Sequence, residues 1–280
     1  MKSSLPTFRP LMIISGSAIA LQLLTGCATP RAPERLVDQN TQGVIWMQNA
    51  AEYEALLYQA FNAAKLSVDQ AKETQTEPWA VVVDLDETML DNSPYAAWQL
   101  LNGKPYEPAT WIEWCKAGET TALPGAVDFA QHVIAQGGAL FYISNRQNET
   151  YEATFKNLRQ IGFPQVNQTT LLLRTDTSNK EVRFKKVTDA GYDIVLMLGD
   201  NLNDFPEINT YRQGNAERSA AVETNQSAFG TRFIVFPNPS YGDWEGGLAD
   251  GYHQLSAEEK LTLRQQKLNA WSGSASDEER

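Results

Sequence analysis

Four acidic side chains stand within a few residues of the ends of two apolar runs in this sequence. The runs, at 79–83 and 194–198, consist of the β-branched and aliphatic residues typical of strands buried on both faces. In open α/β sheets, ligands bind at the carboxyl ends of the strands, so we expect the four acids to lie close together. They are Asp84, Asp86, Asp200 and Asp204.

A hydroxyl and a cation join these acids by the same argument. Ser144 follows the apolar run 139–143, and Lys180 begins a helical pattern that precedes the strand predicted at 194–198. A carboxylate can attack phosphorus, and a second carboxyl two residues on can protonate the leaving alkoxide. A hard cation, a hydroxyl and an ammonium can neutralise and hold the phosphoryl oxygens. The set therefore predicts phosphoryl transfer through an aspartyl-phosphate.

The elements that must position these side chains alternate along the chain. Strands are predicted at 79–83, 139–143, 170–173, 194–198 and 232–236, with helices at 44–71 (one or two), 126–136, 150–161, 180–189 and 256–271. This alternation predicts an α/β fold with a doubly wound, mostly parallel sheet. The stretch 93–123 is rich in Trp, Tyr and Pro and breaks the alternation, so we expect a small helical cap or insertion there.

The motifs resemble those of the haloacid dehalogenase (HAD) superfamily. The matching positions are Asp84-x-Asp86-x-Thr88, Ser144, Lys180 and Gly199-Asp200-x3-Asp204. The longer phrases VVVDLDETMLDNSPY, LPGAVDFA, FYISNR, VLMLGDNLNDF and YGDWEGGLADGY are similar to one branch, the class C acid phosphatases. These are lipoprotein acid phosphatases and 5′-nucleotidases of the bacterial surface. The likeness extends from about residue 44 to 271.

The resemblance implies a role for each matched acid. Asp84 is expected to be the nucleophile and Asp86 the general acid and base. One Mg2+ per chain is implied, held by the Asp84 carboxylate, the backbone carbonyl of Asp86 and Asp200. Asp204 would steady the waters of the metal from outside its ligand shell. Without the resemblance, Asp200 and Asp204 could equally cap a helix.

The resemblance also implies the contacts of the substrate. Ser144, where many relatives have Thr, and Lys180 are expected to bind phosphate. Trp111 and Tyr241 match aromatic residues that sandwich the base or ring of the substrate in the family. From the residues alone, Ser144 also fits a helix N-cap, which is compatible with phosphate binding. The two rings fit a core equally well.

The N-terminus resembles a lipoprotein signal peptide at 1–26. It carries two basic residues and no acid, and its apolar stretch at 11–24 is shorter than the ~20 residues of a membrane-spanning helix. The stretch ends in LTGC, which resembles the lipobox and predicts lipidation of Cys27. Because Ala28 follows, and not Asp, we expect the cell envelope and the outer membrane as the location. An ordinary signal peptide that contains a Cys is the alternative.

Composition limits the partners. The formal charge of −11 becomes −13 without the two basic residues of 1–26, which does not suit a nucleic-acid polymer. We expect small phosphomonoesters as substrates and a membrane reached through the lipid on Cys27, and self-association stays open. The predicted organisation is a tether at 27–43, a phosphatase domain at 44–271 and a disordered tail at 272–280.

The predicted function is that of a magnesium-dependent acid phosphatase acting on phosphomonoesters, with nucleoside monophosphates as the expected substrates. A phosphoprotein phosphatase is one alternative, because DLDET also opens the small carboxy-terminal-domain phosphatases. A non-catalytic surface lipoprotein that binds nucleotide or haem is the other. The export signal and the aromatic insertion argue against the first, and the intact motifs argue against the second. Thr121 stands six residues after Cys115, where a cysteine phosphatase needs Arg.

Overall fold

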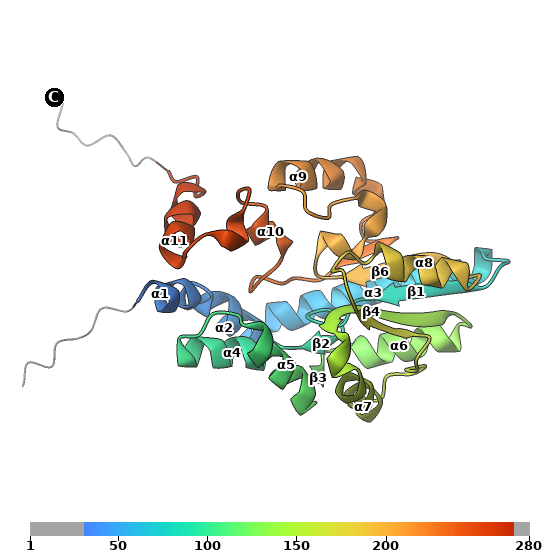
Figure 1. The fold of residues 1–280 in the computed structure, drawn as a ribbon. Helices are drawn as coiled ribbons and strands as arrows, with labels where there is room; N and C mark the ends of the chain where they lie inside the picture. Colours follow the sequence, from blue (N-terminus) through green and yellow to red (C-terminus); the bar gives the residue numbers. More distant parts are fainter. Residues whose placement is uncertain (1–30, 272–280) are drawn as a thin grey trace, which may run out of the picture. The chain divides into compact units, whose positions relative to one another are not determined.

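The computed structural model describes residues 31–271 (Figure 1). The predicted signal peptide, the lipidation site Cys27 and the tail at 272–280 lie outside these residues. Within 31–271, no helix has both the length and the apolar character needed to cross a membrane.

Five parallel strands form the centre of the fold, in the order β5-β4-β1-β6-β7. Their bounds are β1 (Trp79–Val83), β4 (Ala139–Gln147), β5 (Leu171–Arg174), β6 (Asp193–Gly199) and β7 (Phe233–Val235). The chain runs outward from β1 through β4 to β5, then returns to the other side of β1 with β6. The strand order therefore reverses between β1 and β6. The predicted doubly wound α/β fold is confirmed.

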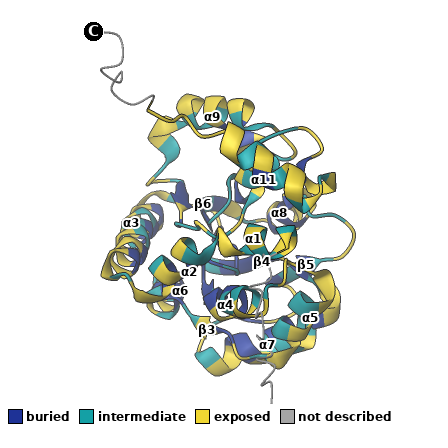
Figure 2. Cartoon of the chain, turned by 90° about the vertical axis from the view of Figure 1, so that its left-hand side faces the viewer, coloured by how far each residue is buried: buried dark blue, intermediate teal, exposed yellow. Residues whose placement is uncertain are grey.

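Helices cover both faces of the sheet (Figures 1 and 2). One face packs against α3 (Ala51–Thr74), α6 (Ala126–Ala135) and α7 (Tyr151–Ile161), and the other against α8 (Glu181–Asp189). Val81 and Val83 belong to the first core cluster, whereas Ala80 and Val82 belong to the second. Because alternate residues of a strand face opposite sides, a continuous apolar run is what a strand between two helical layers requires.

A helical insertion leaves the main sheet after β1. The short strands β2 (Leu90–Asp91) and β3 (Thr121–Ala122) pair antiparallel, and helices α4 (Ser93–Asn102) and α5 (Pro108–Ala117) lie between them in the chain. Proline stands in the first turn of both helices, where its missing N–H costs no hydrogen bond. The stretch expected to form a cap at 93–123 is thus two helices that start and finish at one two-stranded ladder.

The N-terminal helices differ from the predicted tether at 27–43. Helices α1 (Ala32–Asp38) and α2 (Thr41–Asn49) precede α3, and α1 packs against α4 and against α11 (Ala257–Gln266). The Arg264 side chain on α11 donates a hydrogen bond of 2.8 Å to Gln39. The prediction of a tether is therefore wrong from residue 32 onward. It missed α1 because that helix has no buried residue and is held by polar contacts, which leave no apolar period.

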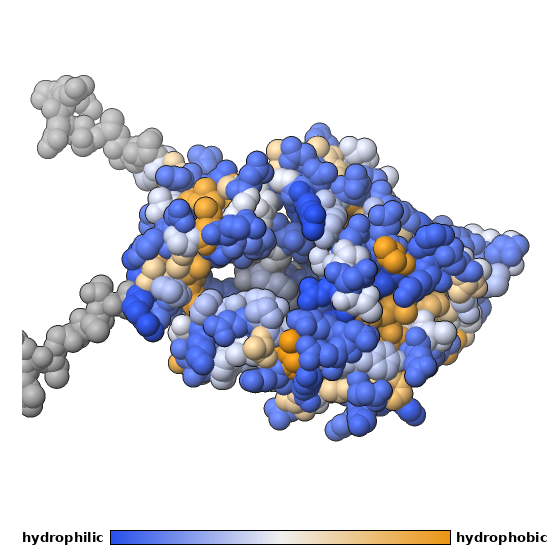
Figure 3. All heavy atoms as spheres, in the orientation of Figure 1, coloured by the Kyte–Doolittle hydropathy of each residue, from blue (hydrophilic) through white to orange (hydrophobic). Residues whose placement is uncertain are grey.

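Further unpredicted helices lie in the region between β6 and α11, on either side of the predicted strand β7. This region contains the helices α9 (Asn215–Thr224) and α10 (Asp243–Gly246) and several single turns of 3₁₀-helix. Only one side chain of α9, that of Arg218, is buried. The face of the molecule drawn in Figure 3 is mostly hydrophilic, with small separate apolar areas.

Candidate active site

Three carboxylates meet where the strand order reverses. Asp84 is the first residue after β1, and its backbone N–H donates to the carbonyl of Leu198 on β6 at 2.9 Å. Asp200 is the first residue after β6. Each of Asp84, Asp200 and Asp204 offers an oxygen, and these oxygens lie within 4.8 Å of one another. The point of reversal is where ligands bind in doubly wound sheets, and the structure brings three of the predicted acids together there.

Asp204 reaches the cluster through a tight turn. The Asn201 N–H donates to Asp204 Oδ2 at 3.0 Å and closes the 3₁₀ turn Leu202–Asp204. At Gly199 an added Cβ would lie 2.3 Å from the Asp204 Cβ, so only glycine permits this approach. Asp204 therefore caps a turn and also faces the cluster, and its role beside a metal stays a prediction.

Lys180 supplies the positive charge of the cluster. It is the N-cap residue of α8, is buried, and its ammonium contacts Asp84 Oδ1 and lies 2.7 Å from Asp204 Oδ1. Burial lowers the pKa of Lys180, but the carboxylates of Asp204 and Asp84 raise it by more, so the pKa lies above its ordinary value. The raised pKa favours the charged form of Lys180 beside the carboxylates of Asp84 and Asp204.

Burial and the neighbouring carboxylates raise the pKa values of two acids in the cluster. Burial raises the pKa of Asp84 to about 7, opposed by Lys180 and reinforced by Asp204 and Asp86. Burial, reinforced by Asp204 and Asp84, likewise holds the pKa of Asp200 well above its ordinary value. A set of oxygen donors with unbalanced negative charge fits a hard divalent cation such as Mg2+. Asp84, Asp200 and Asp204 are the side chains that could hold it.

Asp86 lies on the opposite side of the site, toward the insertion. Its Oδ1 accepts hydrogen bonds of 2.9 Å from Arg146 Nε and from Asn92 Nδ2, and its Oδ2 accepts one of 3.2 Å from Ser144 Oγ. The Ser144 hydroxyl also accepts from the Arg146 N–H at 3.0 Å, within β4 and away from any helix start. Three side chains therefore fix the carboxylate of Asp86.

The two predicted aromatic residues border this same polar network. The Arg146 guanidinium lies 5.8 Å from the ring centre of Trp111 on α5. The ring centres of Trp111 and Tyr95 are 5.2 Å apart. Tyr241 follows β7, and its hydroxyl donates to the carboxylate of Glu87. Among the described residues the rings of Trp111 and Tyr241 do not stack on each other. Any group held by both would lie between them.

Sequence analysis missed the buried arginines that support the site. In addition to Arg146, Arg183 on α8 donates to Asn145 Oδ1 at 2.6 Å, and Arg218 on α9 donates to Asn201 Oδ1 at 3.2 Å. Each guanidinium binds a site residue or the neighbour of one, and all three arginines are at most 5% exposed. The burial of Arg183 could have been predicted, because it lies beside Phe184 on the apolar side of its helix.

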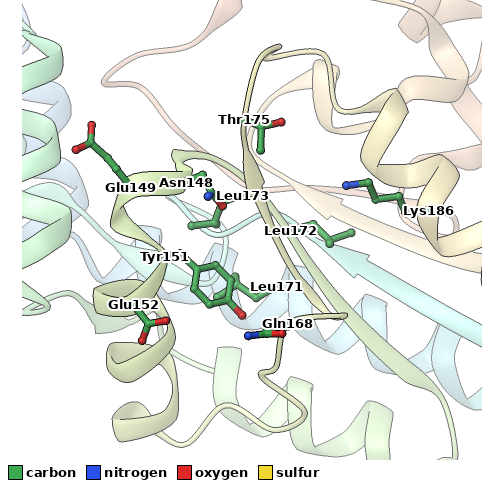
Figure 4. A pocket seen from close by; sticks show the side chains of 10 residues that line it. All are labelled: Asn148, Glu149, Tyr151, Glu152, Gln168, Leu171, Leu172, Leu173, Thr175 and Lys186. Carbon is green, nitrogen blue, oxygen red and sulfur yellow. The ribbon is translucent and has the colours of Figure 1, made fainter.

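A separate hollow of about 460 Å³ lies at the edge of the sheet. It is lined by residues such as Tyr151 at the start of α7 and Leu173 on β5, together with Lys186 (Figure 4). None of the clustered carboxylates lines it. The clustered carboxylates therefore lie outside this hollow.

A family model matches most of the chain. Residues 24–244 match the model for HAD superfamily, subfamily IIIB (acid phosphatase). The chain belongs to this family of phosphomonoester hydrolases.

Solved structures are similar over most of the chain. The class C acid phosphatase from Bacillus anthracis has a TM-score of 0.80 and 39% identity, and the match covers 85% of this chain and 99% of that one. The crystal structure of that protein with tungstate bound matches equally well.

Curated relatives match a shorter region. Acid phosphatase 1 of Solanum lycopersicum is 27% identical over 131 residues, which is 44% of this chain and 51% of the relative. Vegetative storage protein 1 of Arabidopsis thaliana is 28% identical over 131 residues, 45% of this chain and 48% of the relative. The chain thus spans about half the length of the curated relatives it matches.

Proposed function

We propose that the chain hydrolyses phosphomonoesters with Asp84 as nucleophile, Asp86 as general acid and base, and Mg2+ as cofactor. The observation that carries this proposal is the meeting of Asp84, Asp200 and Asp204 at the reversal point of the sheet. Membership of an acid phosphatase family supports it.

The chemistry proceeds in two displacements. A carboxylate oxygen of Asp84 forms a bond to phosphorus while the ester bond breaks, and Asp86 gives its proton to the leaving oxygen. Water then attacks phosphorus, Asp86 takes a proton from it, and phosphate leaves with the Asp84 carboxylate restored. A bound Mg2+ supplies positive charge against the phosphoryl oxygens and the carboxylates. Ser144 and Lys180 bind the remaining phosphoryl oxygens.

Nucleoside monophosphates are the proposed substrates. Trp111 and Tyr241 flank the network around Asp86, one through Arg146 and the other through Glu87. A flat base attached to the leaving group would meet aromatic surface on this side of the site. We also propose that the enzyme acts at the cell envelope, anchored to the outer membrane by the lipid on Cys27.

A substrate panel tests these proposals. Phosphate release is measured with Mg2+ at acid and at neutral pH, from p-nitrophenyl phosphate, AMP, ribose 5-phosphate and a phosphoserine peptide. We expect turnover of p-nitrophenyl phosphate and a higher kcat/KM for AMP than for ribose 5-phosphate. Preference for the peptide would favour a phosphoprotein phosphatase. AMP binding by calorimetry without turnover of any ester would favour a non-catalytic binding protein.

A further inference from the structure

Glu87 combines two unfavourable features. Its side chain is 1% exposed, and its backbone has φ of +57°, in the left-handed region that favours glycine. Burial raises the pKa of its carboxyl well above the ordinary value, reinforced by Asp86 and Asp200. A residue kept in such a conformation and such surroundings points to a requirement for its side chain.

The two carboxylate oxygens of Glu87 have different partners. Oε1 accepts from the Asn92 N–H at 2.9 Å, which ties together the turn before α4. Oε2 accepts from the hydroxyl of Tyr241, 154 residues further along the chain. The first contact is local and explains a turn. The second joins the residue after Asp86 to a loop beyond β7, so local folding does not require it.

The loop that carries Tyr241 is fastened to the site at a second point. Asn238 Nδ2 donates to Asp200 Oδ2 at 2.8 Å, and Asn238 Oδ1 accepts from the Ser240 N–H at 2.9 Å. The loop backbone is thereby fixed at the carboxylate cluster, whereas the Tyr241 side chain extends toward Glu87. With its hydroxyl bound and 42% of the residue exposed, the ring has a fixed orientation and a free surface.

We propose that Glu87 is a positioning residue that determines substrate specificity through Tyr241. Its carboxylate holds the Tyr241 hydroxyl, so that the ring stands beside Asp86 with its exposed surface toward the leaving group. The substrates favoured by this arrangement are phosphomonoesters whose leaving group carries a flat aromatic ring. The inference rests on the proposed function, and adds the contact that makes Tyr241 a fixed surface.

The two acceptor contacts of Glu87 suit a carboxyl group better than an amide. In the structure both of its oxygens accept hydrogen bonds, and an amide has only one oxygen to offer. In Glu87→Gln one position becomes an NH2 donor, to which the Tyr241 hydroxyl can still bind as acceptor. The link is therefore weakened in Glu87→Gln, and it is removed in Tyr241→Phe with the ring retained.

The test compares AMP with ribose 5-phosphate, which has the same sugar phosphate and no base. We expect Tyr241→Phe to raise KM for AMP about tenfold, the effect of one lost hydrogen bond, and so to lower the ratio of kcat/KM for AMP to that for ribose 5-phosphate. Glu87→Gln should fall between wild type and Tyr241→Phe. The double variant should resemble Tyr241→Phe, because the link is already absent there.

Tyr252→Phe is the matched control. The Tyr252 hydroxyl donates to Glu245 on α10, so this variant also loses a tyrosine–glutamate hydrogen bond. It should leave the ratio of kcat/KM for AMP to that for ribose 5-phosphate unchanged. An equal fall of the ratio in this control would indicate general loosening and overturn the inference. An unchanged KM for AMP in Tyr241→Phe would also overturn it.

The proposed function and the inference fail separately. If the wild type hydrolyses ribose 5-phosphate and AMP equally well, the phosphatase activity stands and the positioning role is overturned. If the wild type hydrolyses neither, the proposed function fails, and AMP binding by calorimetry replaces kinetics. Weaker AMP binding in Tyr241→Phe than in Tyr252→Phe then supports the positioning role, and equal binding overturns it.

Discussion

The buried carboxylates on the two sides of the site are compensated by positive charge to different extents. On one side, Lys180 contacts two of the three clustered carboxylates, those of Asp84 and Asp204, and burial raises the pKa of Asp84 to about 7. On the other side, the carboxylate of Asp86 has its own guanidinium, from Arg146, at 2.8 Å. We call these the metal side and the acid side.

This difference indicates what each side does before substrate arrives. The metal side carries more negative charge than its protein partners balance, so a divalent cation can bind there with a large electrostatic gain. The acid side is held by protein hydrogen bonds, so Asp86 keeps its place with or without a cation. Mg2+ should therefore increase the free energy of unfolding by binding to the metal side, and it should have no such effect through the acid side.

The largest effect is expected from Arg146→Met. Removal of the fully buried guanidinium deprives Asp86 of its ion-pair partner, and breaking a buried ion pair costs about 3–5 kcal/mol. Urea denaturation measures the loss, which should be the same with Mg2+ and with EDTA. A loss that Mg2+ repairs would contradict the separation of the two sides.

Lys180→Met is the counterpart on the metal side. Without its ammonium, Asp84 and Asp204 lose their ion-pair partner, and we expect a loss of about 3 kcal/mol in EDTA, the lower end for a buried pair. Saturating Mg2+ should restore most of it, because binding to the native state adds stability in proportion to the logarithm of ligand concentration. Thermal unfolding in the two buffers checks this. Equal losses in both would argue against a cation at this cluster.

The pH dependence of stability follows from Asp84. Because its folded pKa of about 7 lies above the unfolded value, the native state binds the extra proton, and stability in EDTA falls as pH rises between the two values. We expect a decrease in Tm of about 4 °C from about pH 5 to pH 7.5. The increase in Tm produced by Mg2+ should grow over the same range, since the metal requires ionised ligands. Calorimetry on Asp84→Asn should show a flatter profile.

The smallest effect concerns Ser144. In Ser144→Ala, Asp86 loses one hydrogen bond of 3.2 Å and keeps those from Arg146 and Asn92. We expect kcat/KM for p-nitrophenyl phosphate to fall about fivefold to tenfold, the effect of one hydrogen bond. Ser144→Thr keeps the hydroxyl and should lose less. Steady-state kinetics compares the two, and equal losses would mean that the hydroxyl is not what matters.

The metal side could be predicted from sequence because its signals are local. The run 79–83 has no polar residue, which indicates a strand buried on both faces, and Asp84 follows it directly. The run 194–198 is also wholly apolar, and Asp200 follows it after Gly199. The strand ends of a parallel sheet meet at one edge, so the geometry of the cluster follows from the pattern. The roles of these residues in catalysis stay predictions.

The acid side could be predicted only in part. Asp86 and Ser144 were found from their places after strands, but Arg146 pairs with Asp86 across 60 residues and Tyr241 with Glu87 across 154. Such pairs leave no period in the sequence. Helix α1 was missed for a related reason, since polar contacts hold it and no apolar stripe marks it.

Phosphate release from p-nitrophenyl phosphate tests the central claim most directly, with wild type and Asp84→Asn assayed in Mg2+, after EDTA, and after Mg2+ is restored. We expect EDTA to abolish wild-type turnover and Mg2+ to restore it, whereas Asp84→Asn stays inactive throughout although it remains folded. Turnover by Asp84→Asn, or by wild type in EDTA, would contradict a mechanism that requires the Asp84 carboxylate and a divalent cation.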